Sequence, residues 1–313
     1  MIFKNKILLG LSLLIATTGH GAWFDTICQK LNNDSRAFAA CAVVLATVAL
    51  YARASKTNLP DKLQENQPDF YIFFDLGDVL LATDKFKVFC GEPSLFIRHI
   101  CSHGLPQEDR LFAMMDQATG LFRGLATTNG KQLPGIMCNW LQGATSSDEL
   151  VETITSLPQE DRFFKSSLEQ QMLCKMAQLM LPANLIASRK LTSTMQLFAE
   201  CCQKYPGQVG ILSNWDADSV ELLKQKFPEI FSKIDQKMVF FSSECSHYKP
   251  NEAIYKHVEK KLDNSRARFI LIDDQKVNVD AAINCGWSAV WHLNDMQTAK
   301  GLDKVLRSLS CLP

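Results

Sequence analysis

The sequence has no surplus of charge of either sign. It contains 33 Lys and Arg residues and 33 Asp and Glu residues, so its formal net charge at pH 7 is +0. General nucleic-acid-binding proteins carry a basic surface and a high isoelectric point, and the balanced composition argues against that class. A small anionic ligand remains compatible with this balance, because one binding site needs only a few local cations.

Glycine-rich nucleotide-binding motifs are also absent. The chain contains neither the G-x-x-x-x-G-K-[ST] loop that surrounds nucleotide phosphates nor the G-x-G-x-x-G turn of dinucleotide-binding domains. A nucleotide kinase or a dinucleotide-dependent enzyme is therefore not expected.

The chain has 11 cysteines but no C-x-x-C pair. Their number is odd and their spacing irregular, and Cys201 and Cys202 are neighbours, which suits neither a disulfide framework nor a tetrahedral zinc site. We interpret them as small apolar residues in a reducing compartment. His99 and His103 are four residues apart, but Ile100 replaces the glutamate of the zinc-protease motif H-E-x-x-H.

Two uncharged segments predict a signal or transmembrane region over residues 1–58. Ile7–Thr17 follows two lysines, as in a secretory signal, and Ala37–Ala52 is a second apolar run. We favour a hairpin of two spanning segments, which places the flanking Lys and Arg residues and the main domain in the cytoplasm. In one alternative the signal is cleaved, Ala37–Ala52 serves as an anchor and the protein is exported. In another, Ala37–Ala52 is a helix packed on the globular domain.

Buried strands alternate with helical patterns in the rest of the chain. Phe70–Phe74, Val209–Leu212 and Phe269–Ile272 are short apolar runs that predict strands, and Lys237–Phe241 and Ala289–Trp291 predict two more. This order is typical of an α/β fold, a three-layer Rossmann-like parallel sheet.

Between these strands lies a long helical pattern, including Pro106–Gln117, Asp148–Thr155 and Pro158–Met180, without a convincing strand. We predict a core of residues 59–86 and 189–313, with a helical cap of residues 87–188 inserted after the first strand.

Polar residues follow three of the predicted strands. Asp75, Ser213 and the pair Asp273–Asp274 stand where these strands end, and ligands of open α/β sheets bind at that edge. Carboxylates crowded at one edge repel unless a cation joins them, and their hard oxygen atoms suit Mg²⁺. A carboxylate can also act as a nucleophile toward phosphorus, and Lys249 would supply a positive charge for an anionic group.

Four motifs resemble those of the haloacid dehalogenase superfamily. They are FFDLGDVL around Asp75, ILSN around Ser213, YKPNEAIY around Lys249, and LIDD ending at Asp274 followed by AAINCGW. The resemblance covers residues 69–302 apart from the cap, and most members of the superfamily are phosphatases. It implies that Asp75 is the nucleophile and a Mg²⁺ ligand, and that Asp273, Asp274 and the Gly77 carbonyl complete the metal site. Ser213, Asn214 and Lys249 would bind the substrate.

Gly77 departs from the superfamily pattern. Most of its phosphatases have a second Asp two positions after the nucleophile, which acts as general acid and base. The run F-D-L-G-x-V resembles a subgroup, including sugar-phosphate phosphatases, that has Gly at this position. Asp78 is a candidate substitute for the catalytic acid, although an Asp in a turn is also common for local hydrogen bonding.

Three functions remain open at this point. The first is a Mg²⁺-dependent phosphohydrolase that acts on a small organic phosphate, with sugar phosphates among the candidates, and has neither a nucleic acid nor a nucleotide cofactor as partner. The second is a haloacid dehalogenase, a metal-free reaction that has little use for the Asp273–Asp274 pair. The third is a catalytically weak or silent binding or scaffold protein at a membrane, for which Gly77 is the support.

Overall fold

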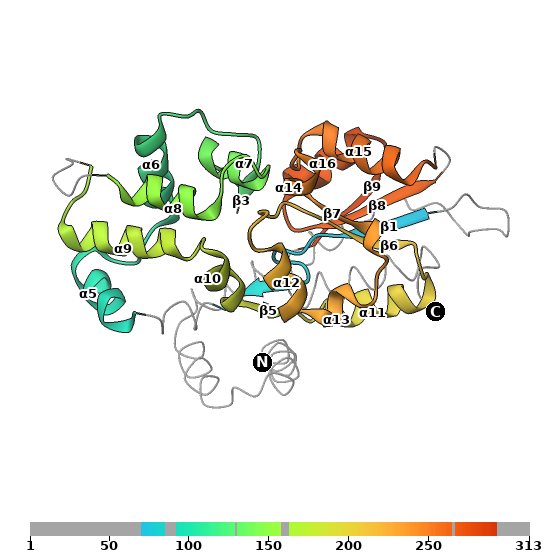
Figure 1. Cartoon of the computed structure of the whole chain (residues 1–313), viewed down its shortest axis with the longest axis horizontal. Coiled ribbons are helices and arrows are strands. Elements are labelled where there is room, and N and C mark those ends of the chain that lie inside the picture. Colours follow the sequence, from blue (N-terminus) through green and yellow to red (C-terminus); the bar gives the residue numbers. More distant parts are fainter. Residues whose placement is uncertain (1–69, 85–91, 129, 158–162, 265–266, 293–313) are drawn as a thin grey trace, which may run out of the picture. The chain divides into compact units, whose positions relative to one another are not determined.

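The computed structural model describes residues 70–84, 92–128, 130–157, 163–264 and 267–292 (Figure 1). All of them belong to the second of two compact units, which begins at Lys62. The signal or membrane segments predicted within residues 1–58 lie outside the described residues. Within the described ranges, no helix combines the length and the hydropathy that crossing a membrane requires.

A five-stranded sheet in the order β7-β6-β1-β8-β9 forms the core, and all of its strands are parallel. The strands are β1 (Phe70–Phe74), β6 (Val209–Ser213), β7 (Val239–Phe241), β8 (Arg268–Asp273) and β9 (Ser288–Trp291). The central strand is β1, in which Phe74 lies beside Ile211 on one side and Ile272 on the other. The sheet confirms the predicted α/β fold.

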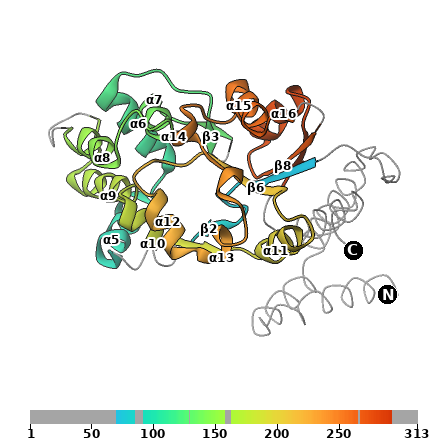
Figure 2. The same cartoon turned by 45° about the vertical axis from the view of Figure 1, so that its right-hand side comes forward.

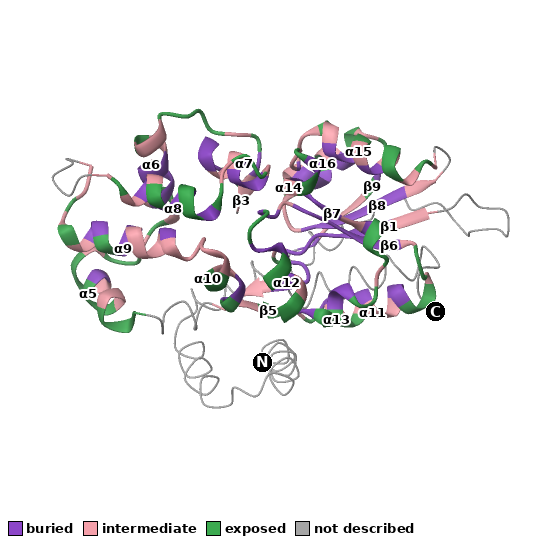
Figure 3. Cartoon of the chain, viewed as in Figure 1, coloured by how far each residue is buried: buried purple, intermediate pink, exposed green. Residues whose placement is uncertain are grey.

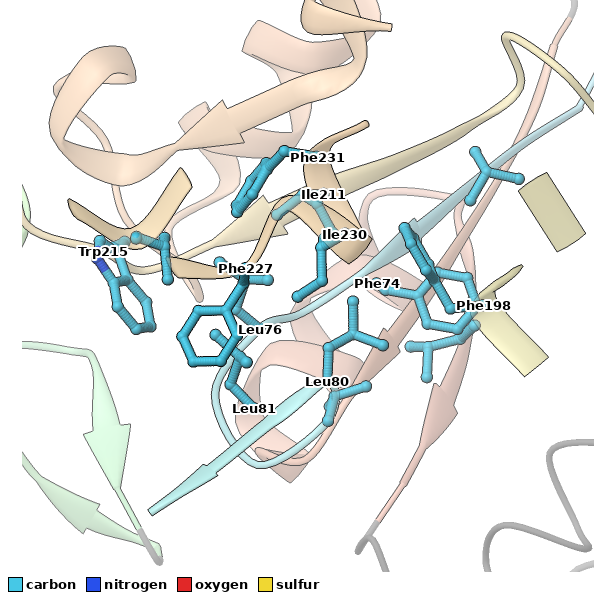
Figure 4. Close-up of a cluster of buried hydrophobic side chains, with 14 of the residues drawn as sticks. Phe74, Leu76, Leu80, Leu81, Phe198, Ile211, Trp215, Phe227, Ile230 and Phe231 are labelled. Atoms are coloured by element: carbon cyan, nitrogen blue, oxygen red, sulfur yellow. The ribbon is translucent and has the colours of Figure 1, made fainter. Parts of the chain in front are cut away.

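Helices cover both faces of this sheet (Figure 1). On one face lie α11 (Met195–Lys204), α12 (Val220–Lys226) and α13 (Pro228–Phe231), and on the other α14 (Ser242–Cys245), α15 (Glu252–Leu262) and α16 (Lys276–Asn284). Strands covered on both faces are continuous apolar runs rather than alternating ones, which explains the composition of β1. Phe74 packs against Phe198 of α11 with ring centroids 5.2 Å apart (Figure 4), whereas Phe73 packs against Trp287 on the opposite face.

A mainly helical insertion separates β1 from β6 along the chain (Figure 2). It is entered through β2 (Leu81–Thr83) and left through β5 (Arg189–Leu191), which pair with each other in antiparallel register. Its elements are α5 (Pro93–His103), α6 (Glu108–Thr119), β3 (Thr127–Thr128), β4 (Lys131–Gln132), α7 (Gly135–Leu141), α8 (Ser147–Thr155), α9 (Ser167–Gln178) and α10 (Pro182–Ala187). Buried side chains of α6, α7, α8 and α9 give it a hydrophobic cluster of its own (Figure 3). The predicted domain boundaries within residues 59–313 stay predictions.

Two expected elements begin later than the sequence indicates. The apolar spacing over Asp216–Phe227 indicates a helix, but α12 begins only at Val220. The Asp216 carboxylate accepts hydrogen bonds from the backbone N–H and hydroxyl of Ser219 and forms a turn there. The strand predicted from Lys237 begins at Val239, and Gln236–Met238 is a short 3-10 helix (η1). The insertion also contains the antiparallel hairpin β3–β4, which the sequence does not indicate.

Candidate active site

Three carboxylates meet at the carboxyl end of the sheet. Asp75 follows β1 directly, Asp273 is the last residue of β8, and Asp274 comes next along the chain. Each offers an oxygen atom, and these three atoms lie within 4.8 Å of one another. The chain places them there because β1 and β8 are parallel neighbours, with Phe74 and Ile272 in register. The backbone N–H of Asp75 donates to the Ile272 carbonyl at 2.9 Å.

Lys249 supplies a buried positive charge to this group. Its Nζ lies 3.0 Å from Asp75 Oδ1 and 2.6 Å from Asp273 Oδ2, and it donates to the Leu212 carbonyl at 2.7 Å. The Lys249 side chain is 1% exposed. An ammonium carries three hydrogens, so each of them has an acceptor in this arrangement. Lys249 therefore joins the ends of β1, β6 and β8.

Ser213 and Asn214 have different surroundings. Ser213 ends β6, is buried and makes a side-chain hydrogen bond with Asp75. The Asn214 side chain is paired with the backbone of Lys249, donating to its carbonyl and accepting from its N–H, both at 2.8 Å. Asn214 thus holds the loop that carries Lys249, and its expected contact with substrate stays a prediction.

Two residues beyond the predicted set hold the acid pair. Asn278 Nδ2 donates to Asp273 Oδ1 at 3.0 Å, and the backbone N–H of Gln275 donates to the same oxygen at 2.8 Å. The side-chain amide of Gln275 donates to Asp274. In the sequence Asn278 lies between the LIDD and AAINCGW motifs, but the start of α16 determines that Gln275 and Asn278 both face Asp273.

Burial and mutual repulsion raise the pKa of two of the three acids. Burial raises the pKa of Asp75 to about 6, with Lys249 acting against the shift and Asp273 adding to it. Burial also raises the pKa of Asp274 to about 8, and the charges of Asp75 and Asp273 contribute. Burial acts to lower the pKa of Lys249, but the adjacent carboxylates of Asp273 and Asp75 raise it above its usual value. Three carboxylates against one ammonium leave excess negative charge, and this donor set of oxygen atoms fits Mg²⁺.

The turn after Asp75 contains Gly77 and Asp78. A Cβ atom at Gly77 would lie 3.6 Å from Asp75 Oδ2, an ordinary contact, so the turn has space for a side chain there. Asp78 is exposed and has a φ of 51°, a left-handed conformation that Asp tolerates better than most residues. Its backbone N–H donates to the Leu81 carbonyl at 2.8 Å. The catalytic role of Asp78 stays a prediction.

No family model matches the chain, and no curated protein matches it by sequence. Among solved structures, it is similar to a HAD family enzyme from Bacteroides thetaiotaomicron, with 16% identity, coverage of 75% of this chain and 99% of the other, and a TM-score of 0.49. The same enzyme in complex with magnesium and inorganic phosphate matches with 18% identity, coverage of 72% and 95%, and a TM-score of 0.45.

Two further solved structures are similar to the chain. A HAD-like family hydrolase from Porphyromonas gingivalis has 19% identity, coverage of 76% of this chain and 98% of the other, and a TM-score of 0.45. A 2-haloacid dehalogenase from Pseudomonas syringae has 14% identity, coverage of 77% and 99%, and a TM-score of 0.43. In this chain the four motifs quoted above meet at one edge of a parallel sheet, and the insertion lies between β1 and β6.

Proposed function

We propose that the protein is a Mg²⁺-dependent phosphohydrolase that acts on a small organic phosphate through an aspartyl-phosphate on Asp75. The observation that carries this proposal is the group of three carboxylate oxygens within 4.8 Å at the end of the sheet, with the buried ammonium of Lys249 against two of the acids. A cation and a carboxylate nucleophile are what transfer of an anionic phosphoryl group requires.

Each side chain has a defined part in the proposed reaction. Asp75, Asp273, Asp274 and the Gly77 carbonyl would hold Mg²⁺, which when bound neutralises charge on the phosphoryl group. A carboxylate oxygen of Asp75 attacks phosphorus while the bond between phosphorus and the leaving-group oxygen breaks, and the electron pair of that bond stays on the leaving-group oxygen. Water then hydrolyses the aspartyl-phosphate and regenerates the carboxylate.

Lys249 keeps Asp75 ionised and adds positive charge on the side of the incoming phosphate. Because its three ammonium hydrogens already have acceptors, direct donation to a phosphoryl oxygen requires Lys249 to exchange one of them. The Ser213 hydroxyl, which is hydrogen-bonded to Asp75, is a second donor for a phosphoryl oxygen. We therefore assign both residues to substrate binding.

Gly77 determines which substrates the proposed enzyme turns over well. A missing general acid typically lowers the rate by about 10²- to 10⁴-fold, and the loss is smallest when the leaving group is a stable anion. Sugar phosphates esterified at the anomeric oxygen, and aryl phosphates, are the substrates that fit this limit.

Gly77 also favours the second candidate, a catalytically silent binding or scaffold protein attached to a membrane through residues 1–58. A dehalogenase is disfavoured because carbon–halogen hydrolysis by a carboxylate does not need a second and a third acid at the site. The phosphohydrolase is better supported, because Asp75, Ser213, Lys249 and the acid pair all meet at one place.

The first experiment is a phosphate-release assay on the full chain. p-Nitrophenyl phosphate and a panel of sugar phosphates are incubated with Mg²⁺ or with EDTA, beside the variants Asp75→Asn and Asp280→Asn. Asp280 is an exposed acid on α16 whose side chain pairs with Lys276, so its variant controls for the loss of one carboxylate. We expect turnover that EDTA and Asp75→Asn abolish and Asp280→Asn leaves intact. Absence of turnover on every substrate would favour the silent binding protein.

A further inference from the structure

Arg189 lies at the point where the insertion returns to the core. It is the first residue of β5 and is paired in register with Thr83 of β2. Its Nη1 donates to the Thr83 hydroxyl at 2.6 Å, and its guanidinium lies over the ring of Trp215, 5.7 Å from the centroid. Trp215 comes two residues after Ser213, so Arg189 is held next to the edge of the sheet that carries the three acids.

The carboxylates of the site act on this guanidinium. Burial lowers the pKa of Arg189, and the negative charges of Asp78 and then Asp75 oppose the shift. The turn that contains Gly77 and Asp78 is joined to β2, because the Asp78 N–H donates to the Leu81 carbonyl at 2.8 Å, and β2 pairs with the strand that carries Arg189.

Much of the hydrogen-bonding capacity of Arg189 is unused. Its Nε is buried and has no hydrogen-bond partner among the described residues, and none of the ion pairs found among those residues includes Arg189. A buried N–H without an acceptor is unfavourable, so Arg189 has donor capacity that its contacts within the protein do not use.

The glycine at position 77 leaves the proposed reaction without a group that stabilises the leaving-group oxygen. The superfamily phosphatases that carry an acid two positions after the nucleophile use it to protonate the leaving-group oxygen, and this chain has no side chain at that position. We propose that Arg189 stabilises the negative charge on the leaving-group oxygen in place of the missing acid, an inference that rests on the proposed phosphohydrolase function.

The proposed step is balanced without a proton from the protein. Asp75 forms a bond to phosphorus while the bond between phosphorus and the leaving-group oxygen breaks, and the electron pair stays on that oxygen. The guanidinium donates hydrogen bonds to the resulting anion and keeps its own protons. Water protonates the leaving group after it departs.

The test compares leaving groups in the full-length protein. Rates are measured on a series of aryl phosphates whose phenols differ in acidity, for the wild type, Arg189→Met and Arg189→Lys. For Arg189→Met we expect kcat/KM to fall about 100-fold on phenyl phosphate and by less than about tenfold on p-nitrophenyl phosphate, because a stable phenolate needs less stabilisation. Added guanidinium ions should restore part of the lost rate. Arg189→Lys should fall between the two proteins.

Thr83→Val is the matched control. It removes one hydrogen bond of Nη1 but keeps the guanidinium and its contact with Trp215, so its dependence on leaving-group acidity should match that of the wild type. An equal loss on all aryl phosphates in Arg189→Met, without rescue by guanidinium ions, would show a purely structural role and overturn the inference. A thermal unfolding measurement shows whether Arg189→Met is folded. If it is not, the dependence of kcat/KM on leaving-group acidity in Arg189→Lys decides.

Failure of the proposed function gives a different result. A wild type without Asp75-dependent turnover on any aryl phosphate contradicts the phosphohydrolase and removes the reaction in which Arg189 is proposed to act. A wild type that turns over while its Arg189 variants keep the same leaving-group dependence contradicts the role of Arg189 alone.

Discussion

Lys249 shows how one side chain can set the chemistry of several others. It is almost completely buried and contacts Asp75, Asp273 and the Leu212 carbonyl at 2.6 to 3.0 Å. A buried charge is stable only when it is paired and hydrogen-bonded, and here both charged partners are acids of the candidate site. The types of residue at the site could be predicted from their positions after strands. The pairing of Asn214 with the Lys249 backbone could not, because that contact depends on how the loop before α15 folds back.

A single substitution at Gly77 tests whether the missing general acid limits the rate of the proposed reaction. In Gly77→Asp the new Cβ meets only Asp75 Oδ2 at an ordinary contact distance of 3.6 Å, and Gly77 is outside the set of glycines with positive φ. The added carboxyl can act as general acid, so we expect kcat/KM on phosphates with poor leaving groups to rise about 10- to 100-fold. Steady-state kinetics on alkyl phosphates measure the change.

Gly77→Asn is the control for this substitution, because it has nearly the same shape but no acid. If Gly77→Asn gives the same rates as Gly77→Asp on every substrate, the absence of an acid at this position does not limit the reaction.

Among the elements, buried strands were the easiest to predict and short turns the hardest. The strand predicted at Phe70–Phe74 coincides with β1. A short run of large apolar residues bounded by polar ones is typical of a buried strand. The hairpin β3–β4 has only two residues in each strand, too few for a period to be visible. The position of Arg189 depends on the antiparallel pairing of β2 with β5, and no sequence motif marks two connecting segments that are more than a hundred residues apart.

Strand β6 contains a glycine that the packing of the sheet requires. A Cβ atom at Gly210 would lie 2.2 Å from the Met238 backbone carbonyl and 2.9 Å from the Phe73 ring. The carbonyl belongs to the backbone and cannot rotate away, so Gly210→Ala forces β6 or η1 to move. We expect the free energy of unfolding to fall by about 1 to 3 kcal/mol, measured by urea denaturation.

The matched substitution is Gly77→Ala, whose Cβ has only an ordinary contact. Its free energy of unfolding should stay within about 0.5 kcal/mol of the wild type. An equal loss of free energy of unfolding in the two variants would mean that the strand shifts at position 210 without an energetic penalty of its own.

For the molecule as a whole, the site concentrates negative charge that the unfolded chain keeps apart. Asp75 and the pair Asp273–Asp274 are nearly two hundred residues apart in sequence and meet only when β1 and β8 pair. Their repulsion therefore destabilises the folded state alone, and a cation that binds the three acids acts in the opposite direction. The stability of the fold and its affinity for Mg²⁺ are linked through this group.

This linkage predicts a pH dependence of the metal-free protein. The pKa of Asp75 is raised to about 6 and that of Asp274 to about 8, so protonation favours the folded state. The stabilising contribution is complete below the ordinary carboxyl pKa and is lost as the pH rises through about 6 and then about 8. In EDTA we expect Tm to decrease between about pH 5 and pH 8.

Added Mg²⁺ should remove most of that decrease, because it neutralises the ionised acids at high pH. Thermal scans with EDTA and with Mg²⁺ measure the difference, and Asp75→Asn should show a smaller decrease than the wild type. A Tm in EDTA that stays constant or rises over this range would contradict the raised pKa values.

The path of the chain through β1, β2 and β5 has a consequence for the integrity of the protein. Asp75 is on the segment before the insertion, whereas Ser213, Lys249 and Asp273 are on the segment after it. A peptide bond cut inside the insertion would divide these residues between two polypeptides. The first polypeptide would still contribute the middle strand, β1, which is hydrogen-bonded on both edges to strands of the second polypeptide, β6 and β8. The nicked molecule should therefore migrate as one particle, and two separately produced pieces should complement each other by supplying opposite halves of the same candidate site.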